Sequence, residues 1–250
     1  MVTLAIDTSH PTGAVTLARD GVVLGTETFS QPSSHLVALA QAVGDLLARG
    51  GLAARDIRRV AVVVGPGSFT GLRIGLAFAK GLHAAGGSGI VPIDTLRLLA
   101  LPQFDRHARV CAMIDARRGE VYAAVLARAG DAERAADPAA ALEVLAPCAR
   151  TPAALLDAIA DEPAVFVGTG ALAARDEIAA RFPRATIAPA AECAPSTAFL
   201  ATIAPRMRPL NEAAVRALEP RYIRPSGAER VKLRSHQTRP ADGESGSHDG

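Results

Sequence analysis

The sequence has few cysteines and no long hydrophobic run, and each absence excludes a class of protein. Its three cysteines are far apart in 250 residues and form no CxxC pair. This spacing argues against a disulfide framework or a zinc site and is typical of a reducing compartment. No apolar run approaches the eighteen or so residues of a transmembrane helix, and Asp7 interrupts the amino terminus before a signal-peptide core could form. We therefore expect a cytoplasmic protein without a membrane partner.

The bulk composition is that of an ordinary globular protein. Hydrophobic residues make up 49% of the chain and charged residues 21%, close to the average for soluble domains. The net charge of +2 is too small to indicate a nucleic-acid or membrane partner. A chain of 250 residues can form one large domain or two small ones, each with a real core.

The amino-terminal part alternates between predicted strands and helices. Short apolar segments joined by turns predict an antiparallel meander over residues 2–6, 13–18 and 22–29. Apolar residues at helical spacing then predict a helix over 35–50, followed by a buried strand at 58–64 and a second helix from 69 to about 82. The predicted class is therefore α/β.

The same pattern begins again in the second half of the chain. "LAIDTSHPTGAVTLARDG" and "AMIDARRGEVYAAVLARAG" each contain a strand ending in Ile-Asp, a polar loop, a second strand and a glycine turn, 108 positions apart from Asp7 to Asp115. This internal pseudo-repeat favours two similar domains, which we place at 1–103 and 104–225. A helical stretch is expected at about 195–218, and residues 226–250 lack apolar periodicity and are expected to form a flexible polar tail.

A glycine-rich stretch, "VGPGSFTGLRIGLAFAKGL", follows the strand at 58–64. The residue five positions after Gly65 is Thr70, so no P-loop is present, and Thr70 also occupies the third glycine position of the dinucleotide fingerprint. A generic anion at the start of this helix remains an alternative. Ser68 or Thr70 is expected to cap the helix.

The other glycines of this stretch favour a smooth helix face. Gly71, Gly75 and Ala79 recur every four residues and lie on one face, although each internal glycine costs about 1 kcal/mol relative to alanine. Such a face allows another backbone to approach closely. The helix is either enclosed by its own domain or awaits a partner.

Motifs along the chain resemble the bacterial TsaB (YeaZ) family, whose members take part in making threonylcarbamoyladenosine at position 37 of tRNA. The motifs are "LAIDTS", "GPGSFTGLRIG", "IDARRGEVY", "VGTG" and "EPRYIRP", in the family's order. The resemblance implies two actin-like (ASKHA, ribonuclease H-like) domains, each with a mixed sheet flanked by helices.

The resemblance also implies a non-catalytic subunit that pairs with the catalytic subunit TsaD through the helices of the first domain, and that is joined by the ATPase subunit TsaE. tRNA would bind through the complex, and a homodimer is the alternative assembly for the isolated chain. The expected partner-binding residues are Leu36, Leu39, Val43, Gly71, Leu72, Gly75, Phe78 and Ala79. With Gly75 in that interface, a Gly75→Leu change is expected to spare the fold and abolish pairing.

In active members of the superfamily, an aspartate that ends the first strand serves metal and phosphates. The equivalent residues here are Asp7, Thr8, Ser9 and Asp115, which the resemblance marks as candidate nucleotide or phosphate ligands. A simple strand-end turn is the alternative for Asp7. A free-standing ATPase or kinase using Asp7 and Asp115 is the alternative function.

The chain departs from the catalytic sister in its histidines. That sister holds a metal with an HxxxH pair, whereas no two of the six histidines here are four positions apart. We therefore expect no catalytic residues and no metal or cofactor in the isolated chain, with ATP and Mg²⁺ used by the complex. A basic stretch at 206–234 either helps to hold tRNA phosphates or is a solvated face.

Overall fold

A computed structural model describes residues 1–30, 35–160 and 163–224 of the chain. The predicted meander and the pseudo-repeat are confirmed, because each half forms a five-stranded mixed sheet with the same connectivity. The strand at 141–150, which completes a second meander, was not predicted. The first sheet has the order β3-β2-β1-β4-β5 and the second the order β8-β7-β6-β9-β10. In each sheet, the three consecutive strands of the meander pair antiparallel. A fourth strand then pairs parallel with the first strand of the meander, and a fifth strand pairs parallel with the fourth.

The strands are β1 (Val2–Asp7), β2 (Gly13–Arg19), β3 (Val22–Phe29), β4 (Ile57–Gly65), β5 (Gly89–Asp94), β6 (Arg109–Asp115), β7 (Val121–Arg128), β8 (Ala141–Arg150), β9 (Val165–Val167) and β10 (Thr186–Ile187). The helices are α1 (His35–Arg49), α2 (Phe69–Gly86), α3 (Thr95–Ala100), α4 (Asp131–Ala136), α5 (Pro152–Ala158), α6 (Thr169–Ala173), α7 (Arg175–Arg181), α8 (Thr197–Ile203) and α9 (Glu212–Ala217). Short 3₁₀ turns join several of them, including η1 (Ala54–Asp56) and η4 (Ala204–Arg206). Within the described residues, no helix has the length and apolarity to cross a membrane.

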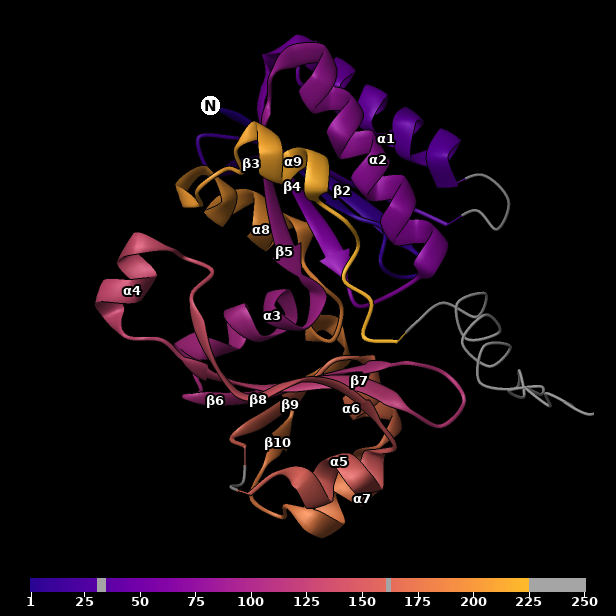
Figure 1. The fold of residues 1–250 in the computed structure, drawn as a ribbon, viewed down its shortest axis with the longest axis vertical. Helices are drawn as coiled ribbons and strands as arrows, with labels where there is room; N and C mark the ends of the chain where they lie inside the picture. Colours follow the sequence, from indigo (N-terminus) through magenta and orange to yellow (C-terminus); the bar gives the residue numbers. More distant parts are fainter. Residues whose placement is uncertain (31–34, 161–162, 225–250) are drawn as a thin grey trace, which may run out of the picture.

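Strand alternation decides which helices cover each face of the first sheet. Leu4 and Ile6 of β1 point into a core shared with α1 and α2. Ala5, between them, points into a second core that α3 and α8 share with both sheets. The fold is therefore layered, with α1 and α2 outermost on one sheet and α5 to α7 on the far side of the other (Figure 1).

The carboxyl-terminal segment returns to the first sheet. Helix α8 packs across β1, β2 and β3, and the Thr197 hydroxyl at its start is 2.8 Å from that of Thr16 on β2. Helix α9 buries Val215 in the core beneath α2. Both helices fall within the range 104–225 assigned to the second domain, so the domain boundaries stay a prediction. The predicted tail, 226–250, lies outside the described residues.

The single helical stretch predicted over 195–218 is wrong, because the structure has two short helices there. Pro205 lies in η4, and Pro209 lies between η4 and α9. Proline has no backbone N–H to donate and its ring clashes with the preceding turn. The chain therefore leaves the helical path and turns from α8 towards α9.

A histidine attaches α9 to α2. Nδ1 of His83 is 2.8 Å from the Ser88 carbonyl oxygen, and its Nε2 is 3.1 Å from a Glu212 carboxylate oxygen. Both neighbours are hydrogen-bond acceptors, and only the imidazolium form can donate to both. The bond to the Ser88 carbonyl, followed by the bond to Glu212, raises the pKa of His83 above its ordinary 6.5.

This attachment should make stability fall as pH rises. Because the pKa is raised in the folded state, the stabilisation is fully present below the unfolded value of about 6.5 and is lost as pH rises through the folded pKa. Glu212 is exposed, so we expect less than about 1 kcal/mol. Urea unfolding of the wild type and Glu212→Gln between pH 5.5 and 8.5 would measure it. Parallel pH curves for the two proteins would contradict the assignment to this pair.

Candidate functional site

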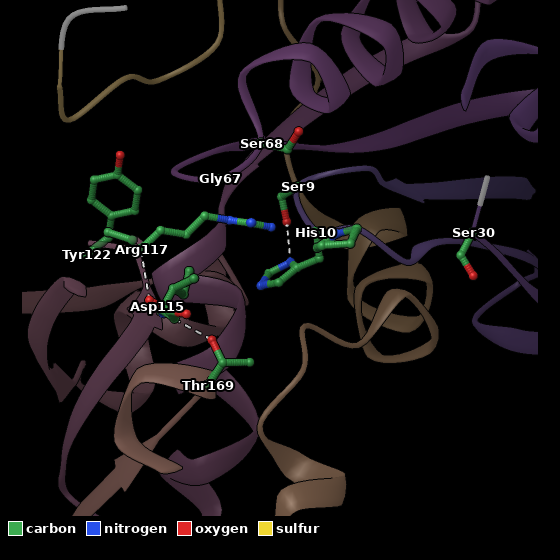
Figure 2. Close-up of a pocket in the computed structure, with 12 residues that line it drawn as sticks. Ser9, His10, Ser30, Gly67, Ser68, Asp115, Arg117, Tyr122 and Thr169 are labelled. Carbon is green, nitrogen blue, oxygen red and sulfur yellow. Dashed lines mark hydrogen bonds between the residues drawn. The ribbon is translucent and has the colours of Figure 1, made fainter. Parts of the chain in front are cut away.

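A cleft of about 970 Å³ lies between the two sheets, at the carboxyl ends of β1, β4 and β6 (Figure 2). The first half of the chain contributes Ser9, His10, Pro11, Ser30, Gly67 and Ser68 to its lining, and the second half contributes Ile114, Asp115, Ala116, Arg117, Tyr122 and Thr169. The volume is in the range of small-molecule sites. The loops that follow β1 and β6, the matching strands of the pseudo-repeat, face each other across it.

The loop after β1 is closed by its own aspartate. The buried Asp7 accepts a hydrogen bond of 2.8 Å from the Ser9 amide through Oδ1. His10 then turns back, so that its Nδ1 is 2.8 Å from the Ser9 hydroxyl and 3.9 Å from Asp7 Oδ2. The strand-end turn expected as the alternative role of Asp7 is therefore present.

The loop after β6 repeats this geometry. Asp115 Oδ1 accepts a 2.7 Å hydrogen bond from the Arg117 amide, two residues on. The Asp115 amide in turn donates to the hydroxyl of Thr169, at the start of α6, over 3.1 Å. Arg117 and Arg118 both have positive φ, at 62° and 58°. Unlike Asp7, Asp115 is exposed to solvent in the cleft.

The four candidate phosphate ligands are only partly brought together. Ser9 and Asp115 line the cleft from opposite sides. Thr8 does not, because it faces α2, and Asp7 is buried behind the loop. Among the described residues, no group of three His, Cys, Asp or Glu side chains lies close enough to hold a metal ion. The Ser9 amide is already bonded to Asp7, so in this conformation it is not free to bind a phosphate.

Several cleft residues were missed from the sequence. His10 and Arg117 follow the two aspartates in the repeated loops, so the pseudo-repeat carried a signal for these two, and the motif "VGTG" carried one for Thr169. Tyr122 ends the motif "IDARRGEVY", whereas Ser30 lies at a position with no motif. Figure 2 shows the Arg117 side chain pointing into the cavity from the second half.

Helix α2 begins beside the cleft and is capped as expected. The Ser68 hydroxyl accepts a 3.2 Å hydrogen bond from the Gly71 amide, which confirms serine capping. The Phe69 ring stacks on Tyr222 with centroids 4.8 Å apart. The Arg73 guanidinium lies 3.7 Å from the centroid of the Phe69 ring, a distance typical of a cation–π contact.

Tyr222 belongs to a strap, residues 220–224, that joins the two halves. The Arg221 amide donates to the Val64 carbonyl at the end of β4 over 2.6 Å, and its guanidinium is 3.4 Å from Asp94 Oδ2. Further on, Arg224 forms an ion pair with Glu120 in the loop between β6 and β7. Residues 219–224 of the motif "EPRYIRP" thus cross from the first sheet to the second beside the cleft.

Asp94 ties the strap to α3. Its Oδ1 accepts hydrogen bonds from the amides of Leu96 and Arg97, at 2.8 and 3.1 Å, so it caps that helix. Burial raises the pKa of this carboxyl, whereas the two amides and the charge of Arg221 oppose the shift. Arg221 is itself exposed, so the ion pair alone stabilises the strap by less than about 1 kcal/mol.

The predicted partner-binding residues need correction. A Cβ on Gly71 would lie 2.0 Å from the Thr8 carbonyl oxygen, and one on Gly75 would lie 2.3 Å from the Thr8 hydroxyl. The smooth face of α2 therefore admits a backbone, but that backbone is the end of β1 in the same chain. Enclosed within the fold are Leu39, Val43, Gly71, Leu72, Gly75 and Ala79. Leu36 is exposed and Phe78 is partly exposed.

A different row of small residues faces solvent on these helices. On α1 the exposed positions Ala40, Gly44 and Ala48 recur every four residues, and Leu36 precedes them at the same spacing. On α2, Ala77 and Gly81 are exposed at the same spacing, in a row that the exposed Arg73 begins. A Cβ on Gly44 or on Gly81 would meet no atom of the described chain within 4 Å. These positions, together with the exposed Val37, make up the outer helix face.

The chain resembles known proteins over most of its length. Residues 23–230 match the family described as "TsaD: tRNA N6-adenosine threonylcarbamoyltransferase". A protein named "tRNA threonylcarbamoyladenosine biosynthesis protein TsaB" from Escherichia coli is 38% identical over 48% of this chain and 52% of its own length. Its namesake from Bacillus subtilis is 35% identical over 49% and 53%. The chain thus spans about half the length of the curated relatives that it matches.

Solved structures support the fold. "YeaZ from Pseudomonas aeruginosa" matches with a TM-score of 0.62 and 25% identity, over 81% of this chain and 90% of the other. A second Pseudomonas aeruginosa structure, described as similar to peptidase YEAZ, has a TM-score of 0.69 at 24% identity, over 89% and 99%. The second likeness shows the fold alone. The chain belongs to the TsaD family that matches residues 23–230, and within it to the TsaB (YeaZ) proteins.

Proposed function

We propose that this chain supports N6-threonylcarbamoylation of adenosine 37 in tRNA, in the cytoplasm, as a non-catalytic subunit that pairs with TsaD. The names of the Escherichia coli and Bacillus subtilis relatives support a place in this biosynthesis. The spacing of the six histidines, which lacks the HxxxH pair, supports a non-catalytic role. ATP, Mg²⁺ and the ATPase subunit TsaE belong to the assembly in this proposal.

The observation that carries the proposal is the outer helix face of α1 and α2. Leu36 and Val37 are 52% and 55% exposed at its start, and beyond them the face is made of alanine and glycine apart from Arg73. A strip of small side chains lets a partner helix approach closely, and large apolar side chains at one end supply buried area. The same face would serve a homodimer when TsaD is absent.

Adding bulk to this face should break pairing without harming the fold. In Gly44→Gln and Gly81→Gln, a good helix former replaces glycine where the described chain leaves open space. We expect the affinity for TsaD to fall about tenfold or more, because overpacking a close contact costs about 1–3 kcal/mol. Co-purification and calorimetric titration with TsaD would measure the loss.

The matched control is Ala153→Gln on α5, where another small residue is exposed on a helix of the second half. It should pair like the wild type. If both glycine variants also pair normally while keeping wild-type melting curves, the outer helix face is not the TsaD interface.

The alternative function is a free-standing ATPase or kinase. One observation favours this alternative: Ser9 and Asp115 both line the cleft, whose volume is in the range of small-molecule sites. Against this alternative, Asp7 is buried and its Oδ1 already accepts a hydrogen bond from the Ser9 amide. The accessory role therefore remains the better account of the chain.

A further inference from the structure

We propose that this chain contacts RNA directly, through a group of exposed arginines at the end of the first sheet where the parallel strands β1, β4 and β5 begin. The group consists of Arg19, Arg55, Arg58 and Arg208 and is called here the basic end. The phosphate backbone is the ligand that these side chains fit. The identity of the RNA as tRNA rests on the proposed function; the phosphate contact itself does not.

Strand pairing places the first three of these arginines together. Val2, the first residue of β1, pairs with Arg19 on β2 and with Ile57 on β4. Arg58 follows Ile57 and occupies a bulge, where the pairing skips from Val2–Ile57 to Thr3–Arg59. Arg55 lies in η1, directly before β4. Strands two apart are separated by about 10 Å, so Arg19 and Arg58 flank the start of β1.

Arg208 joins the group from the far end of the chain. The neighbouring Met207 accepts a 2.8 Å hydrogen bond from the Arg59 guanidinium through its carbonyl oxygen. On the other side, Pro209 lies 3.0 Å from where a Cβ on Gly89, the first residue of β5, would be. Arg208 therefore sits between the amino ends of β4 and β5.

The basic end is not neutralised by carboxylates in the described part of the chain. All four arginines are exposed, and none has an ion pair there. The nearby acids are engaged: Asp20 pairs with the terminal amine, and Asp56 accepts the Ala53 amide over 2.8 Å. Some arginines elsewhere are neutralised, since Arg49, Arg97 and Arg106 each have a glutamate partner. Unpaired guanidinium groups are the donors that phosphates bind.

The position of the basic end suits a role in the complex. The cleft opens at the carboxyl ends of the strands, whereas these arginines lie at the amino end of the first sheet. The outer helix face covers one side of that sheet and borders the basic end, because η1, which carries Arg55, contacts α2. RNA bound at the basic end would therefore leave the cleft free and lie beside the proposed TsaD interface.

An anionic membrane is the competing partner. Val22 and Leu24, close to Arg19 along the chain, are 66% and 44% exposed, and a basic surface with an apolar edge can also bind lipid. We favour RNA because three of the four arginines lie on η1, β4 and the segment after η4, away from that edge. Vesicle binding is therefore one arm of the test.

The test is the salt dependence of tRNA binding by the full chain, alone and with TsaD. Each phosphate contact contributes about 0.9 to the slope of log K against log salt. The double variant Arg58→Ala/Arg208→Ala should bind more weakly and reduce the slope by about 2. The control Arg118→Ala/Arg175→Ala removes the same charge from exposed sites of the second half and should leave the slope unchanged.

Two outcomes would overturn the inference. One is an equal slope for both double variants; the other is binding to phosphatidylserine vesicles that only the first variant loses, with tRNA binding intact. Co-purification with TsaD separates this inference from the proposed function. If the Arg58→Ala/Arg208→Ala variant pairs with TsaD and binds tRNA like the wild type, only the inference about the basic end is refuted. If the wild-type chain fails to pair with TsaD, only the proposed accessory role is refuted.

Discussion

Gly71→Ala should destabilise the protein by about 3 kcal/mol or more, although alanine normally favours a helix over glycine by about 1 kcal/mol. The new Cβ would lie 2.0 Å from the Thr8 carbonyl oxygen, which is backbone and cannot rotate away. Helix α2 cannot shift outward easily, because Leu72 and Leu76 on it are buried in the core. Urea unfolding monitored by circular dichroism would measure the loss.

Gly81→Ala is the matched control on the same helix. Nothing in the described chain lies within 4 Å of its added Cβ, so it should stabilise the protein by about 0.5–1 kcal/mol. Opposite signs at positions ten residues apart would show that the enclosed face of α2 is set by contact with Thr8 and not by helix propensity. Equal effects would mean that α2 does not rest on the end of β1.

The packing of α2 against Thr8 also means that Gly75→Leu cannot test the TsaD interface. Because a Cβ at Gly75 would lie 2.3 Å from the Thr8 hydroxyl, a leucine there would disturb the fold itself. Any loss of pairing in that variant would follow from loss of structure. The outward positions Gly44 and Gly81 are therefore the informative sites for the interface.

Gly65→Ala should be the second severe substitution, costing about 3 kcal/mol or more and detaching the strap. Gly65 has φ of +118°, a region that side chains rarely adopt, and its added Cβ would lie 2.6 Å from the Arg221 carbonyl oxygen. Either the strap moves away or β4 distorts. Thermal unfolding would report the loss of stability, and limited proteolysis near Arg221 would report the freed strap.

Gly119→Ala separates backbone strain from the clash. Gly119 also has positive φ, +74°, but no atom of the described chain lies within 4 Å of an added Cβ. It should therefore cost only about 1 kcal/mol, the strain of the conformation alone. If Gly65→Ala costs no more than Gly119→Ala and leaves the strap as resistant to protease as before, the strap does not press on β4.

The sequence was sufficient to predict the first meander, the repeat of its first two strands and the capped α2, because turns and apolar alternation are local signals. It was not sufficient to show which side of α2 faces inward. That helix is apolar on nearly every face, so both Gly71 with Gly75 and Ala77 with Gly81 formed plausible smooth rows. Only the position of Thr8 at the end of β1, a long-range contact, distinguishes them.

Only part of the candidate site could be predicted, because most of its contacts join residues that are far apart along the chain. Asp7 and Asp115 were recognised because each ends a strand in the repeat, but their roles depend on which amides they accept. His10, Arg117 and Thr169 reach the cleft only when the two loops face each other. The strap residues Arg221 and Arg224 could be recognised as part of a motif, yet their partners Asp94 and Glu120 are about a hundred residues away along the chain.

The return of α8 to the first sheet has a consequence for how the protein is made. Ala5, Ala18 and Ala61 form a face that Leu200 and Ala201 cover, and these two leave the ribosome after nearly two hundred residues have been synthesised. Until then, α3 can cover β4 and β5 on that side, but the apolar part over β1 and β2 stays bare. The amino-terminal half must therefore wait for the last quarter of the nascent chain, and messages truncated before α8 should yield aggregates in place of a free-standing half.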